Sequence, residues 1–125
     1  MKEIKEVNEL KEKLSKNRKI LSVYLFGSAV NGKLRRMSDI DICIIGKLNG
    51  SEKRKILRES SEKFDISFFD ELPITIKFRV FRDGKELFVR DELRIGIIKM
   101  ETLKEYRDYY ETVKKRISER FENVR

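Results

Sequence analysis

Apolar residues along this chain follow two spacings, and each spacing predicts a different kind of element. Short apolar or alternating runs are typical of strands, whereas apolar residues three or four positions apart are typical of amphipathic helices. The runs predict four strands: Ile20–Phe26, 39–45, Phe64–Phe69 and Glu86–Val89. The helical spacing, with capping residues, predicts five helices: 3–16, Ser28 to about Gly32 or Leu34, Ser51 to about Lys63, 73–82, and one that starts near Asp91. This order is typical of an α/β (α+β) sandwich, in which helices pack against a small mixed sheet.

Segment 73–82 fits both spacings. Apolar residues at alternate positions, such as Ile76 and Phe78, fit a strand, whereas the interval between Phe78 and Phe81 fits a helix. The proline at its start and Gly84 just past its end follow the usual asymmetry of helix termini. We therefore predict a helix here and a short edge strand after it. The Asn-Gly pair at 49–50 predicts a turn, and Ser51 is then the expected N-cap of the next helix.

From Asp91 the apolar residues recur every three or four positions as far as Val124. This spacing predicts one amphipathic helix of roughly 30 residues, about 45 Å long. A compact domain of this size does not cover such a helix, so we expect its apolar stripe to bind a partner or a second copy of the chain. The alternative is a C-terminus that folds back on the core. We expect a single domain over 1–125, with a core at about 1–90 and the long helix at about 91–123.

Composition restricts the chemistry that this chain can perform. It has 125 residues, of which 42% are charged, and a formal net charge of +8. This balance favours a nucleotide, RNA or an acidic protein as partner, or else reflects a thermophile-like surface rich in Lys and Glu. The absence of His excludes His-based acid–base chemistry, Ser–His–Asp triads and His-containing zinc sites, which leaves carboxylates and metal. With Cys43 as the only cysteine and no apolar run near the roughly 20 residues that span a membrane, we expect a cytoplasmic protein with no membrane partner.

Candidate chemistry lies between the first two predicted strands. Gly27 and Ser28 occupy the point where a strand turns into a helix. Free N–H groups at a helix start bind phosphate, and glycine lets the ligand approach the backbone closely. After ten further residues, Asp39 and Asp41 share one face of the second strand because side chains alternate along a strand. Two carboxylates so placed suit cations such as Mg²⁺, and the combination is typical of phosphoryl or nucleotidyl transfer.

The glycine–serine pair followed after ten residues by Asp39-x-Asp41 resembles the signature of the DNA polymerase β-type nucleotidyltransferase superfamily. The small size resembles its minimal nucleotidyltransferases (MNT), which are often paired with HEPN proteins. The resemblance extends to about Tyr110 and implies a polymerase β-like fold with a helix over 73–82. It also implies that Asp65, in the third strand, is a metal ligand; by itself Asp65 is an exposed acid at a strand edge.

The resemblance implies a metal-dependent nucleotidyltransferase. Gly27 and Ser28 would bind the phosphates of ATP or another nucleoside triphosphate. Asp39, Asp41 and Asp65 would be the catalytic residues and would bind two Mg²⁺ ions, for which Mn²⁺ can substitute. The family also implies that the chain is an antitoxin that moves AMP to a hydroxyl of a HEPN toxin. The chain is not itself the HEPN ribonuclease, whose motif includes a histidine.

Two alternatives remain open from the sequence. The nucleotide could be transferred to RNA or to a small hydroxylated molecule such as an aminoglycoside, although relatives of that kind usually carry further domains that hold the acceptor. The chain could instead be a non-catalytic module that binds nucleic acid or a partner. The presence of all three acids counts against a degenerate site of that kind.

Overall fold

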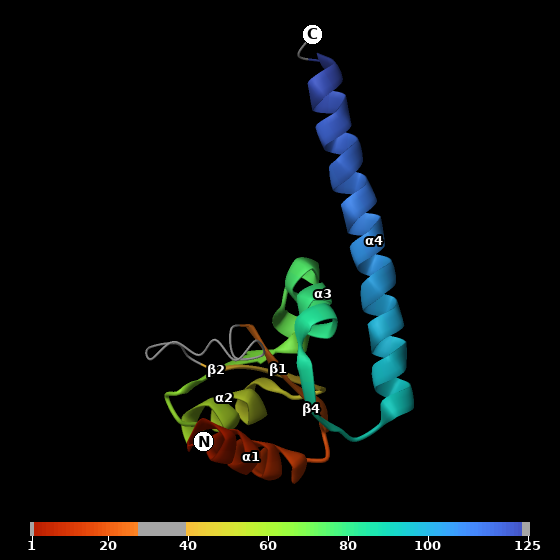
Figure 1. Ribbon diagram of the computed structural model, residues 1–125. Coiled ribbons are helices and arrows are strands. Elements are labelled where there is room, and N and C mark those ends of the chain that lie inside the picture. The colour runs from red at the N-terminus through yellow and green to blue at the C-terminus, as the bar shows by residue number, and fades with distance from the viewer. Residues whose placement is uncertain (1, 28–39, 124–125) are drawn as a thin grey trace.

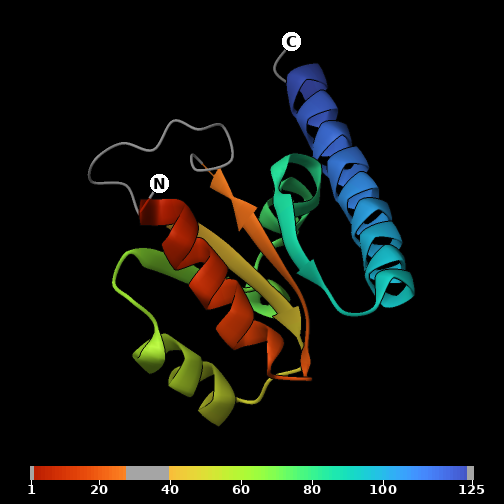
Figure 2. The same ribbon diagram turned by 60° about the horizontal axis from the view of Figure 1, so that its bottom comes forward.

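The computed structural model describes residues 2–27 and 40–123, and the side chains of 5–27 and 40–122. A four-stranded sheet has helices on both of its faces (Figure 1, Figure 2). Within the described ranges, no helix is long and apolar enough to cross a membrane. The elements, in chain order, are α1 (Lys2–Ser15), β1 (Ile20–Phe26), β2 (Ile40–Gly46), α2 (Gly50–Glu59), β3 (Phe64–Phe68), the 3₁₀ turn η2 (Phe69–Glu71), α3 (Ile74–Asp83), β4 (Lys85–Val89) and α4 (Glu92–Asn123).

The sheet is mixed, as the sequence predicts. Its strand order is β3-β2-β1-β4. The strand β1 is antiparallel to both β2 and β4, whereas β2 and β3 are parallel. The predicted edge position of β4 is confirmed. The alternative interpretation of segment 73–82 as a strand is excluded, because α3 occupies it with Pro73 as its N-cap and Gly84 as its C-cap.

One face of the sheet packs against α1 and α2. The helix α1 contributes Leu10 and Leu14, which recur at helical spacing and are both buried. The strand β2 contributes Ile40, Ile42 and Ile44, which share this face because alternate side chains of a strand point the same way. Partly buried apolar residues of α2 and β3 complete the cluster. This face is the principal core of the molecule.

The other face of β2 is buried as well. Cys43 and Ile45 pack there with Tyr24 of β1, Val80 of α3 and Ile95 of α4. The helices α3 and α4 therefore cover this side of the sheet, opposite α1 and α2 (Figure 2). Cys43 is fully buried in this core, and its burial raises the pKa of the thiol to about 12.

The start of α2 differs from the prediction. Asn49, not Ser51, is the N-cap: its side chain accepts a hydrogen bond from the backbone N–H of Glu52 at 2.8 Å. The Glu52 carboxylate in turn accepts one from the backbone N–H of Asn49 at 3.1 Å. This reciprocal capping box starts the helix at Gly50, so the predicted Asn-Gly turn is wrong. The helix also ends earlier than the predicted Lys63, at Glu59.

The strands end within one residue of their predicted limits. The strand β2 runs one residue further than expected, to Gly46, and β3 stops at Phe68 because Phe69 begins η2. Asp70 lies inside this turn. The helix α4 starts where expected: the Asp91 carboxylate accepts a hydrogen bond from the backbone N–H of Arg94 at 3.0 Å.

Candidate active site

The end of β1 brings the backbone of Gly27 against a carboxylate of the neighbouring strand. Phe26 pairs with Asp41 across the antiparallel ladder, so Gly27 lies beside Asp41. A Cβ atom at Gly27 would overlap Oδ2 of Asp41 and lie 3.1 Å from its Cγ. The φ angle of Gly27 is also positive, at 80°. Only glycine therefore allows this backbone conformation and this close approach together.

The next strand supplies a second carboxylate in register. Asp41 of β2 pairs with Asp65 of the parallel strand β3. Paired residues of adjacent strands point to the same face, so both carboxylates lie on the side of the sheet that carries Cys43. Asp41 is half-buried and Asp65 is exposed. Alternation along β3 places Asp65 opposite Phe64, which packs against the other core.

This arrangement fits a divalent cation. Neighbouring carboxylates repel each other, and a cation between them neutralises that repulsion. Exposure of Asp65 leaves a route for a ligand from solvent, whereas the close contact with Gly27 fixes the position of Asp41. Carboxylate oxygens are also the ligands that Mg²⁺ prefers. The described residues hold no cluster of three His, Cys, Asp or Glu side chains, and the predicted third acid, Asp39, is not among them.

Part of the predicted site lies outside the described residues. Ser28 and Asp39 both belong to the interval 28–39, together with the predicted short helix that starts at Ser28. The structure thus brings together Gly27, Asp41 and Asp65 of the five predicted site residues.

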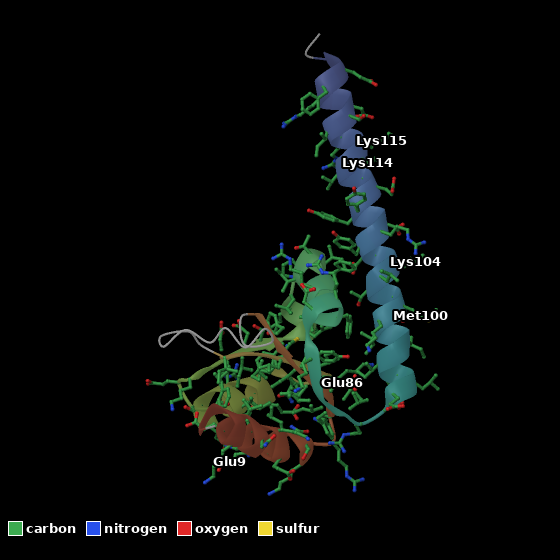
Figure 3. The ribbon with its side chains drawn as sticks, viewed as in Figure 1. Glu9, Glu86, Met100, Lys104, Lys114 and Lys115 are labelled. Carbon is green, nitrogen blue, oxygen red and sulfur yellow. The ribbon has the colours of Figure 1, made fainter. Side chains whose placement is uncertain are left out.

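A buried tyrosine next to this site was not anticipated from the sequence. The Tyr24 hydroxyl donates a hydrogen bond of 3.0 Å to Oε2 of Glu86, which lies on β4 (Figure 3). Burial, and then the hydrogen bond to the Glu86 carboxylate, raise the pKa of Tyr24 well above its usual value. The ammonium group of Lys99 lies 5.9 Å from the centre of the Tyr24 ring. Tyr24 and Glu86 meet because β1 and β4 pair in an antiparallel register. The sequences of the two strands do not specify this register, so the contact could not be predicted from them.

A cleft of about 700 Å³ lies at the other end of β2, next to Gly46 rather than Asp41. Ile45 and Phe69 contribute apolar surface, and Lys77 and Arg94 contribute charge. Acidic side chains such as Asp91 and Glu101 also line this cleft. The cleft does not include Gly27, Asp41 or Asp65, so it is separate from the carboxylate pair.

Sequence comparison identifies a matching family and a related protein. Residues 8–93 match the family model described as polymerase beta, nucleotidyltransferase. A protein of Methanocaldococcus jannaschii named "Putative protein adenylyltransferase" is 33% identical over 108 residues, which is 86% of this chain and 84% of the relative.

Solved structures share the fold. A chain from a toxin–antitoxin crystal structure with AMP-PNP superposes with a TM-score of 0.70 at 20% identity, over 92% of this chain and 95% of that one. A chain from a complex of a tri-AMPylated Shewanella oneidensis HEPN toxin with an MNT antitoxin gives a TM-score of 0.66 at 18% identity, over 95% and 98%. The family match covers most of the chain and includes the Gly27–Asp41–Asp65 site, so this protein belongs to the polymerase β nucleotidyltransferase family.

Proposed function

We propose that this protein transfers AMP from ATP to a hydroxyl group of a HEPN-type partner protein and so acts as the antitoxin of a toxin–antitoxin pair. The observation that carries the proposal is the in-register pair of Asp41 and Asp65 beside Gly27. The protein acceptor is supported by the name of the M. jannaschii relative. It is supported further by the structural neighbours, which include a complex of a HEPN toxin with an MNT antitoxin.

The proposed site contains five residues. Asp39, Asp41 and Asp65 would hold two Mg²⁺ ions, or Mn²⁺ in their place. Gly27 and Ser28 would bind the β- and γ-phosphates through backbone N–H groups and the serine hydroxyl. When bound, divalent cations neutralise phosphate charge and lower the pKa of an attacking hydroxyl.

The chain's own residues then position the reactants. The acceptor oxygen forms a bond to the α-phosphorus while the bond from that phosphorus to the bridging oxygen of pyrophosphate breaks. The proton of the acceptor hydroxyl passes to Asp65, which is exposed and therefore reachable by an acceptor on another macromolecule. AMP remains on the acceptor, and pyrophosphate leaves.

The net charge of +8 supports one further candidate, transfer of the nucleotide to RNA. We infer in addition a single domain over 1–125 and a heat-adapted source, from the Lys- and Glu-rich composition. We also propose a cytoplasmic location, which the single cysteine supports because it cannot form a disulfide within the chain.

Co-expression with the protein encoded by the neighbouring gene tests this proposal. Intact-protein mass spectrometry should find one or more AMP additions on the partner. Co-expression with Asp41→Asn should leave the partner unmodified, with the variant still folded. AMP on RNA, with an unmodified partner, would replace this proposal with the RNA candidate.

A further inference from the structure

We infer that the distal half of α4 is a docking surface for a helix of a partner protein whose own apolar stripe is flanked by acidic side chains. The inference rests on the proposed function for the partner's role as acceptor, whereas the surface itself is argued from α4. We use "distal stripe" for an apolar row that begins at Leu103, before the midpoint of α4, and continues along the distal half through Tyr110, Val113, Ile117 and Phe121.

The first half of α4 packs on the rest of the molecule. Ile95 and Thr102 are 1% and 5% exposed, respectively. The ring of Tyr106 stacks on that of Phe78 in α3, with centroids 3.8 Å apart and planes 4° from parallel. Beyond this stack, no described side chain of α4 is buried, and the helix continues alone (Figure 1). At 1.5 Å per residue, the stretch after Tyr110 extends for about 20 Å.

The apolar positions continue along α4 although the described residues leave most of them exposed. Tyr110 is 52% exposed, Ile117 50% and Phe121 72%. Leu103, Tyr110 and Ile117 are separated by seven residues each. A repeat of seven residues is the spacing with which two helices pack against each other along a common seam. Exposed apolar surface of this extent and regularity marks an interaction site.

The charges beside the distal stripe indicate which partner fits. With 100° between successive residues, Arg107 and Lys114 lie along one edge of the stripe and Arg120 along the other. The acidic residues of this stretch, such as Glu111, lie on the far side of the helix. Lys115 also lies on the far side, although it adjoins Lys114 in sequence.

Basic edges disfavour a second copy of the same helix. In a parallel or an antiparallel pair of α4 helices, the cationic edges would face each other and repel. A helix with acidic edges would instead place carboxylates opposite Lys114 and Arg120, and its apolar stripe would cover Ile117. The phosphates of RNA would pair with the cationic side chains, but RNA would leave the distal stripe exposed to water.

The path of α4 places this surface near the candidate active site. In β4, Val89 pairs with Ser22, and Lys85 pairs with Leu25, two residues before Gly27. The chain then reverses, so that Lys99 of α4 lies over Tyr24. The helix thus runs toward the end of the sheet that carries Gly27 and projects past it (Figure 1). A partner held on the distal stripe would be held on the active-site side of the molecule.

A designed peptide tests the surface without ATP or metal, so the result is independent of catalysis. The probe is a fluorescent peptide of about three heptads with Leu at the seam and Glu at both edges. We expect the full-length protein to bind it in fluorescence anisotropy, and not to bind peptides with Lys edges or with Gln at the seam. Ile117→Glu should abolish binding while circular dichroism stays unchanged, because Ile117 is half-exposed.

Lys114, at the edge of the distal stripe, and Lys115, on the far side of the helix, provide a test variant and a matched control. Lys114→Glu should weaken binding of the Glu-edged peptide about three- to tenfold, as expected for reversal of one exposed charge pair, whereas Lys115→Glu should change it less than twofold. Equal effects of the two variants would mean that the peptide is bound by general charge attraction and not by this edge of the helix. That result would overturn the inference. A wild-type dimer in sedimentation that Ile117→Glu makes monomeric would assign the surface to a second copy. Binding of an RNA oligonucleotide that is lost in Ile117→Glu would assign it to RNA.

Discussion

The contact between Gly27 and Asp41 is the residue-scale feature that explains why a glycine must precede the loop into β2. The Asp41 carboxylate occupies the space in which a Cβ at position 27 would lie. The backbone there is also left-handed, with φ at 80°. Backbone conformation and packing thus exclude other residues independently. The glycine therefore fixes a carboxylate of the site, in addition to its expected role of exposing backbone to phosphate.

Gly27→Ala should lower stability and displace Asp41. The left-handed conformation costs an L-residue about 1–2 kcal/mol, and the overlap with the carboxylate adds to it. Thermal unfolding should show a Tm lower by several degrees. Gly96→Ala is the control: no atom lies within 4 Å of its added Cβ, and it sits inside α4. That change should stabilise the protein by up to about 1 kcal/mol. A Gly27→Ala protein as stable as wild type would contradict this geometry.

The increase in Tm that divalent cations produce should depend on both Asp41 and Asp65. Because a cation binds only the folded arrangement of the carboxylates, Mg²⁺ or Mn²⁺ should raise the Tm of the wild-type protein. Asp41→Asn should remove most of the increase, and Asp65→Asn should reduce it. Asp108→Asn, which removes a carboxylate from α4, should leave it unchanged. A full increase in both Asp41→Asn and Asp65→Asn would exclude a shared metal site.

At the scale of elements, α2 shows how a local hydrogen-bond pattern outweighs a turn signal. Asn49 and Glu52 cap the helix reciprocally, and Lys19 donates to the Glu52 carboxylate at 3.0 Å. Asn49→Ala should cost about 1 kcal/mol in the free energy of unfolding, measured by urea titration. Asn8→Ala, at an exposed position inside α1, is the control and should be neutral or slightly stabilising. An equal loss in both variants would argue against the cap.

The same cap predicts a pH dependence. The backbone hydrogen bond from Asn49, followed by the bond from Lys19, lowers the pKa of Glu52 below its ordinary 4.5. A lowered folded-state pKa contributes stability that is present above the unfolded value and is lost as pH falls through the folded value. The stability difference between wild type and Glu52→Gln should therefore be constant above about pH 5 and shrink toward pH 3. A difference that persists unchanged at pH 3 would contradict the assigned cause.

Most helices and strands were predictable because the spacing of their apolar residues matches the repeat of the helix or the strand. The apolar run in β1 and the spacing of α4 fix those elements within a residue or two. The start of α2 was missed because Asn-Gly is also a turn signal, and only the Glu three residues later distinguishes a cap. Tyr24 and Glu86 lie 62 residues apart, and their contact depends on the pairing of β1 with β4, which no local pattern encodes.

The candidate site was predictable to a similar degree. Alternation along the strands correctly placed Asp41 and Asp65 on the faces opposite the principal core. Their register, by contrast, depends on the parallel pairing of β2 with β3. The contact between Gly27 and Asp41 likewise requires the strand order. Ser28 and Asp39 lie outside the described residues, so their part in the site stays a prediction.

At the scale of the whole molecule, the sheet separates two layers of helices, and its active-site end faces the side toward which α4 projects (Figure 1). The exposed carboxylate of Asp65 and the uncovered distal stripe both suit an acceptor that is itself a macromolecule. Catalysis and docking then use separate surfaces of one small chain. A variant in one surface should leave the other intact, so the two activities can be measured independently.

The most direct test of nucleotidyl transfer uses ATP labelled at either the α- or the γ-phosphorus, with Mg²⁺ and the protein encoded by the neighbouring gene. Attack at the α-phosphorus predicts that the α-label becomes covalently attached to that protein, while the γ-label leaves in pyrophosphate. Asp41→Asn should abolish attachment, and Asp108→Asn should not. Attachment of the γ-label, or an α-label that persists in Asp41→Asn, would contradict the account.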